Sequence, residues 1–186
     1  MSNYKRVIDR SDYFFFTVVT HNRRKFLTDT KSRASLKIAM ERTRTEYPFE
    51  IIAICLLPEH LHCVMKLPHT DKNYSLRWSL IKKRFTHRYL KSGGYELEQS
   101  DSRKNHRHRG VWQKRFWEHQ IRDSEDLNNH INYVHFNPIK HRLTKELTDW
   151  PWSTYHDYVK SGRYGNVNLK QMQEGIENIF VKEFDD

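Results

Sequence analysis

The chain has 186 residues and a formal net charge of +10, with a sequence pI of about 9.6. This length suits one domain with its own core, and the charge favours a polyanionic partner such as nucleic acid. Cys55 and Cys63 lack metal or redox spacing, so we expect two buried, reduced thiols. Residues 1–10 lack the apolar stretch of a signal peptide, and no segment resembles a membrane helix, so we expect a cytoplasmic protein.

The first third of the chain predicts three strands and a helix. Aromatic and β-branched residues at 13–20 predict a buried strand. Clustered apolar positions predict a helix at 28–46, which a proline ends. Strands are predicted at 49–57 and 60–67, and their close spacing indicates a hairpin.

The middle of the chain continues the alternation. A helix is predicted at 75–90, followed by a long polar loop at 92–109 and a fourth strand at 111–121. Asp123 begins a last helix, which Pro138 is expected to end near Asn137. The order β-α-β-β-α-β predicts an α+β, ferredoxin-like (RRM-like) antiparallel sheet with helices on one face, plus a C-terminal helical tail. We expect one catalytic domain at 1–160 and a partly helical tail at 161–186.

A pair of histidines in the third strand is the first candidate site. His60 and His62 are two residues apart, so both imidazoles project from one face of the strand. Imidazole is a ready ligand for transition metals. Taken alone the pair is weak evidence, because the chain has 12 histidines and two hydrogen-bonded strand histidines would look the same.

A second pair lies on the last predicted helix. Tyr133 and Asn137 are four residues apart and share a helix face. The amide oxygen of Asn137 can bind a metal, and the phenol of Tyr133 can attack a phosphate that a metal polarises. A half-buried tyrosine and an asparagine before a proline are also ordinary helix chemistry.

Together with other segments, these two motifs resemble the REP-associated tyrosine transposases, relatives of the single-tyrosine HUH transposases of insertion sequences. Five segments spread over about residues 4–160 carry the resemblance. They are LPEHLHC at 57–63, IKKRFTH at 81–87, WQKRFWEH at 112–119, YVHFNPIKH at 133–141 and DWPWST at 149–154. The chain departs from the family pattern at Arg142, where glycine is common, and in its long 92–109 loop.

The resemblance implies a metal-dependent reaction on single-stranded DNA. His60, His62 and Asn137 would hold Mg²⁺ or Mn²⁺, and Tyr133 would form a 5′-phosphotyrosine link that a 3′-OH can reverse. Glu59 and His119 are candidates for orienting the ligands. The implied substrates are single-stranded hairpins of repetitive extragenic palindromes beside a short guide sequence. The implied setting is the bacterial cytoplasm, in association with the nucleoid, as a monomer or weak dimer.

Basic residues are candidates for a phosphate track, although most charge runs on helices are simply solvated. The candidate DNA-binding residues are Lys5, Arg6, Arg23, Arg24, Lys82, Lys83, Arg84, Arg88, Arg107, Arg109, Lys114 and Arg115. The acidic segment 171–186 could compete with DNA phosphates, or could be an ordinary terminal helix.

Two other functions remain compatible with these observations. One is a non-catalytic single-stranded nucleic-acid-binding protein of RRM-like fold, although the chain has no RNP1-like pattern. The other is a relaxase or replication initiator with the same chemistry, although this chain has no room for a helicase domain.

Overall fold

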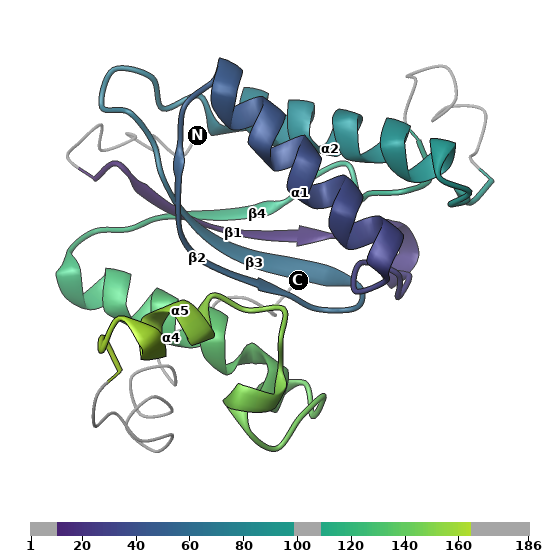
Figure 1. Ribbon diagram of the computed structural model, residues 1–186. Coiled ribbons are helices and arrows are strands. Elements are labelled where there is room, and N and C mark those ends of the chain that lie inside the picture. Colours follow the sequence, from purple (N-terminus) through teal and green to yellow (C-terminus); the bar gives the residue numbers. More distant parts are fainter. Residues whose placement is uncertain (1–10, 99–108, 165–186) are drawn as a thin grey trace, which may run out of the picture.

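The computed structural model describes residues 11–98 and 109–164 (Figure 1). Four strands form one antiparallel sheet in the order β2-β3-β1-β4. The predicted α+β class is therefore confirmed, and β3 separates the parallel pair β1 and β2 as in a split βαβ unit. The bounds are β1 Tyr13–Val19, η1 His21–Arg23, α1 Thr30–Glu46, β2 Glu50–Leu56, β3 His60–Lys66, α2 Tyr74–Lys91, β4 Trp117–Gln120, α4 Ser124–Lys140, η2 Leu147–Asp149 and α5 Tyr155–Lys160.

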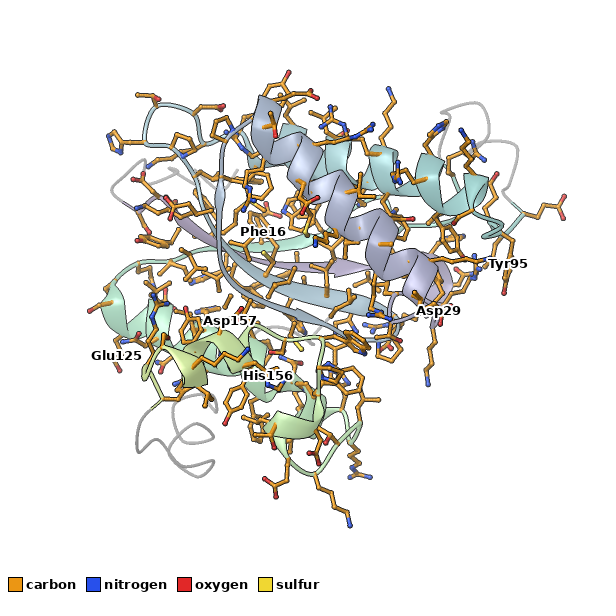
Figure 2. The ribbon with its side chains drawn as sticks, in the orientation of Figure 1. Phe16, Asp29, Tyr95, Glu125, His156 and Asp157 are labelled. Atoms are coloured by element: carbon orange, nitrogen blue, oxygen red, sulfur yellow. The ribbon has the colours of Figure 1, made fainter. Side chains whose placement is uncertain are left out.

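The helices lie on both faces of the sheet, not on one face as predicted. Helices α1 and α2 pack together over one face, and α4 packs on β2 and β3 from the other (Figure 1). The alternation of strand side chains explains why both faces need cover. Phe14 and Phe16 enter the cluster under α1 and α2, whereas Phe15 enters the cluster under α4. Figure 2 shows Phe16 between the sheet and the α1–α2 layer.

Local sequence explains where the helices begin. The side chain of Asn73 accepts a hydrogen bond from the Leu76 amide at 3.0 Å and starts α2. Asp123 does the same for α4, accepting from the Asp126 amide at 2.9 Å. Acidic side chains in the first turn of α4 also suit the positive end of the helix dipole.

The fourth strand is shorter than predicted. Only Trp117–Gln120 pairs with β1, and Trp112 makes an isolated bridge to Thr20. Between them the backbone turns toward α2, because Lys82 Nζ donates to the carbonyls of Gln113 at 2.7 Å and Lys114 at 3.2 Å. These carbonyls are bonded to a side chain and not to a neighbouring strand, which ends the regular pairing.

Pro138 does not end α4, which continues to Lys140. Proline removes the hydrogen bond that its own nitrogen would donate, and its ring crowds the carbonyl four residues earlier, but the amides after it can still bond. The turn closes instead through His141 N to Asn137 O and Leu143 N to Pro138 O, each at 2.9 Å. Arg142 follows with φ of 56°, a left-handed conformation that glycine adopts with less strain.

No helix in residues 11–98 and 109–164 is long and apolar enough to cross a membrane. The predicted C-terminal tail lies outside the described residues from 165 onward, as does most of the predicted 92–109 loop.

Candidate active site

The histidine pair of β3 faces α4. His60 and His62 stand opposite Val19 and Thr17 in the register with β1. Their Nε2 atoms are 3.1 Å apart, and both side chains are buried. The strand thus brings the two imidazoles together as the alternation of side chains predicts.

Each imidazole is held through its other nitrogen. Glu59 Oε1 lies 3.0 Å from His60 Nδ1, and Thr17 Oγ1 lies 2.9 Å from His62 Nδ1. A carboxylate at Nδ1 keeps the proton there and leaves the lone pair on Nε2, which is the usual arrangement beside a metal. The hydrogen bond from His60 is also the main reason that the pKa of Glu59 is lowered.

Helix α4 brings Tyr133 and Asn137 to the same place. The Tyr133 ring lies 5.2 Å from the His62 ring at an angle of 72°. Asn137 Nδ2 donates to the Tyr133 carbonyl at 2.7 Å, which turns the amide oxygen away from that bond. This Oδ1 atom is buried and has no hydrogen-bond partner in the described part of the chain. Such an atom ordinarily costs about 1–3 kcal/mol, so a missing ligand is a natural explanation.

Two further residues of α4 and its end join the cluster, and sequence reasoning gave neither a role. Lys140 Nζ donates to the Tyr133 hydroxyl at 3.0 Å and lies 4.6 Å from the ring centroid. His141 has a ligand nitrogen within 4.8 Å of those of His60 and His62. Their spacing was the available signal, because positions 133, 137, 140 and 141 share one helix face.

His62 and His141 favour their neutral form. Burial, followed by the proximity of His60, holds the pKa of His62 well below its ordinary value. Burial and then His60 lower the pKa of His141 to about 4. Neutral imidazole is the form that binds metal ions, so the electrostatics of the cluster agree with its donor set.

His119 lies in a different cluster. Its Nε2 atom is 2.8 Å from Asp126 Oδ2, and Asp126 Oδ1 is 3.0 Å from His130 Nδ1. Although burial raises the pKa of Asp126, hydrogen bonds from His119 and Arg122 lower it to about 2. The Phe15 ring contacts both the His130 and the His62 rings, so this cluster borders the first one without sharing its atoms.

Several of the predicted DNA-binding residues are engaged within the protein. Arg24 bonds the Tyr95 carbonyl, Lys82 bonds two carbonyls, Arg84 pairs with Glu46 at 2.6 Å and Arg109 pairs with Glu96 at 2.6 Å. The Nε atom of Arg88 is buried without a hydrogen-bond partner among the described residues. Exposed side chains are those of Arg23, Lys83, Lys114 and Arg115. Lys5, Arg6 and Arg107 lie outside the described residues.

A basic groove runs between α2 and the segment before β4. Its cavity volume is about 710 Å³. Basic and aromatic side chains line it, including Lys83, Lys114, Trp112 and Phe116. Cationic and stacking groups side by side are the combination that binds single-stranded nucleic acid.

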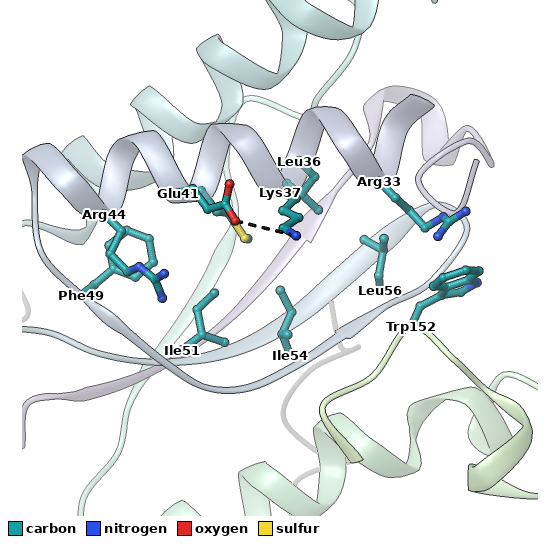
Figure 3. A pocket seen from close by; sticks show the side chains of 11 residues that line it. Arg33, Leu36, Lys37, Glu41, Arg44, Phe49, Ile51, Ile54, Leu56 and Trp152 are labelled. Atoms are coloured by element: carbon teal, nitrogen blue, oxygen red, sulfur yellow. Dashed lines mark ion pairs between the residues drawn. The ribbon is translucent and has the colours of Figure 1, made fainter. Parts of the chain in front are cut away.

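A smaller and more apolar groove lies between α1 and β2 (Figure 3). Its cavity volume is about 390 Å³, and Leu36, Ile54 and Trp152 contribute to its walls. Arg33 lies over the Trp152 ring at 3.6 Å. None of the residues of the histidine–tyrosine cluster lines this groove, so it is separate from the candidate site.

Comparison with known proteins identifies the family of the chain. The sequence profile of the family described as IS200-like transposases matches residues 11–137, which include both pairs. A Haemophilus influenzae protein assigned to the REP-associated tyrosine transposases is 42% identical over 91% of this chain and 97% of its own length. The REP-associated tyrosine transposase of Escherichia coli is 40% identical over 88% of each chain.

A solved structure gives the same answer at the level of the fold. It is a REP-associated tyrosine transposase bound to a REP hairpin, with a TM-score of 0.69, 40% identity and coverage of 87% of both chains. The chain therefore belongs to the IS200-like transposases and, within them, to the REP-associated tyrosine transposases, which makes it a DNA transposase.

Proposed function

We propose that this transposase cleaves and rejoins single-stranded hairpin DNA of repetitive extragenic palindromes through a 5′-phosphotyrosine intermediate. The observation that carries the proposal is the meeting of two imidazoles, a buried unpaired amide oxygen and a phenol between β3 and α4. A purely nucleic-acid-binding protein has no need of this set. The hairpin bound to the related structure supports the same class of partner for this chain.

The donor set suits a divalent cation. His60 and His62 would hold it through their Nε2 atoms, which face each other at 3.1 Å, and Asn137 through Oδ1, which has no hydrogen-bond partner among the described residues. When bound, Mg²⁺ or Mn²⁺ would polarise the scissile phosphate and stabilise the charge that develops on it. Glu59 and Thr17 would keep the two imidazoles oriented.

Tyr133 would be the nucleophile. Its phenol oxygen forms a bond to phosphorus while the bond from phosphorus to the 3′-oxygen breaks, and the 3′-oxygen leaves as a hydroxyl after taking up a proton. Lys140 already donates to this phenol oxygen and would favour the phenolate. Because Tyr133 is only 1% exposed, DNA binding must uncover the phenol before attack.

The basic groove at α2 is our proposed docking surface for the hairpin backbone. Lys83 and Lys114 are exposed there. Lys83→Ala should weaken hairpin binding and reduce its dependence on salt by about one counterion. Lys37→Ala on α1, where Lys37 pairs with Glu41, is the matched control and should change neither. Equal salt slopes in wild type and Lys83→Ala would place the docking surface elsewhere.

The central experiment is to incubate the protein with labelled single-stranded hairpins and Mn²⁺ and to look for a covalent adduct. Tyr133→Phe should lose adduct and cleavage by several orders of magnitude, on the scale of removing a nucleophile, about 10⁴–10⁶-fold. Hairpin affinity should stay close to that of wild type, because the ring and its packing remain. Cleavage by Tyr133→Phe within a few-fold of wild type would overturn the assignment.

A further inference from the structure

A third imidazole lies at the proposed metal site. His141 follows α4 directly, as its C-cap residue. Its ring lies 4.9 Å from the His60 ring at an angle of 68°, and its ligand nitrogen lies within 4.8 Å of those of His60 and His62. This closeness depends on the fold, because about eighty residues of chain separate β3 from the end of α4.

One ring nitrogen of His141 is left without a partner among the described residues. Its Nε2 atom is buried and makes no hydrogen bond within the described residues, and the same holds for Asn137 Oδ1 one turn earlier. These two unpaired atoms lie on one face of the helix, beside two imidazoles that are already oriented through Nδ1. Together the four groups form a set of candidate metal ligands.

In the second histidine cluster, by contrast, the carboxylate oxygens all have partners. The Asp126 carboxylate accepts from His119 and from both the amide and the side chain of Arg122, and His130 lies at its other oxygen. Because both oxygens of Asp126 are paired, the cluster links β4 to α4. His141 has no comparable partner at Nε2.

We infer that His141 is a third imidazole ligand, so that the site is formed by His60, His62, His141 and the amide oxygen of Asn137. This inference rests on the proposed metal-dependent function. Three nitrogen donors and one oxygen donor favour Mn²⁺ or Co²⁺ over Mg²⁺, which prefers oxygen. An ion held by these four residues would also be able to accept a phosphate oxygen of DNA.

The test is direct counting of histidine nitrogens. Metal-free wild-type protein is loaded with Co²⁺ or Mn²⁺ and examined by X-ray absorption and electron spin-echo spectroscopy. Three imidazoles are expected in wild type and two in His141→Ala. The Mn²⁺ affinity measured by calorimetry should fall by at least about 10–100-fold in His141→Ala. His69→Ala, which changes an exposed histidine paired with Asp12, should leave both the count and the affinity unchanged.

The outcomes separate this inference from the function on which it rests. Two imidazoles in wild type, or unchanged affinity in His141→Ala while His62→Ala loses binding, would overturn the role of His141 and leave the metal site standing. Failure of wild type to bind any of these ions would overturn both. The nitrogen count in wild type decides the matter even if His141→Ala does not fold.

Discussion

The two faces of the central sheet use the same strands for different purposes. On β3, Leu61 and Cys63 point into the apolar cluster under α1 and α2, whereas His60 and His62 point toward α4. Neighbouring positions of one strand therefore serve the core and the chemistry separately. The α1–α2 face is packed as an apolar core, whereas the α4 face adds the imidazoles and the unpaired Asn137 amide oxygen to its own apolar cluster.

Substituting adjacent residues of β3 tests most directly whether the two faces of the sheet have separate roles. Leu61→Ala should lower the free energy of unfolding by about 2–5 kcal/mol, because Leu61 is fully buried in the apolar cluster. His62→Ala should lower it by about 2–4 kcal/mol, since it removes a buried ring that packs on Phe15 and Tyr133 as well as the hydrogen bond to Thr17. Urea unfolding measures both effects.

Metal binding should separate the two variants. His62→Ala should lose Mn²⁺ affinity in calorimetry, and Leu61→Ala should retain it at temperatures where the variant is folded. If folded Leu61→Ala also loses Mn²⁺ affinity, the two faces are not separable in the way that the strand alternation indicates.

The same contrast explains what the sequence could and could not predict. Period-two alternation and helical spacing are local, so they predicted the strand histidines and the Tyr133–Asn137 pair. The pairing of Arg84 with Glu46 depends on how α1 meets α2, thirty-eight residues apart in sequence. The end of regular pairing before β4 depends on Lys82, which reaches across from α2. Such contacts follow from tertiary packing and leave no local pattern.

The α4 face should be the more acid-sensitive one. Burial, followed by the proximity of His156, lowers the pKa of His135 to about 3, and its ring bonds Thr154 at 2.9 Å and Tyr164 at 2.6 Å. The folded protein keeps His135 neutral, whereas the unfolded chain takes up a proton as the pH falls below the ordinary value of 6.5. Stability is therefore lost as the pH falls from 6.5 toward 3, by up to about 1.4 kcal/mol per pH unit for this group.

Substitution of His135 tests whether this residue causes the loss of stability at low pH. His135→Gln should be less stable than wild type near neutral pH, because the buried ring packing is lost, but its stability should fall less steeply between about pH 6.5 and about pH 5. Chemical unfolding across this range gives the slopes. His69→Gln, at an exposed position, should keep the wild-type slope. A His135→Gln slope equal to that of wild type would mean that other groups cause the acid sensitivity.

The smallest expected effect concerns the exit of α4. Arg142 has φ of 56°, and a side chain in this conformation is strained, whereas glycine is not. Arg142→Gly should therefore raise the free energy of unfolding by about 1 kcal/mol, after allowance for the greater freedom of glycine in the unfolded chain. Arg142→Ala keeps the strain and removes the charge, so it should remain near wild type. If Ala and Gly stabilise equally, charge and not backbone strain sets the effect. His141 immediately precedes Arg142, so Mn²⁺ affinity should be measured in Arg142→Gly as well. An unchanged affinity would show that the strained backbone at Arg142 is not needed to hold His141 at the metal site.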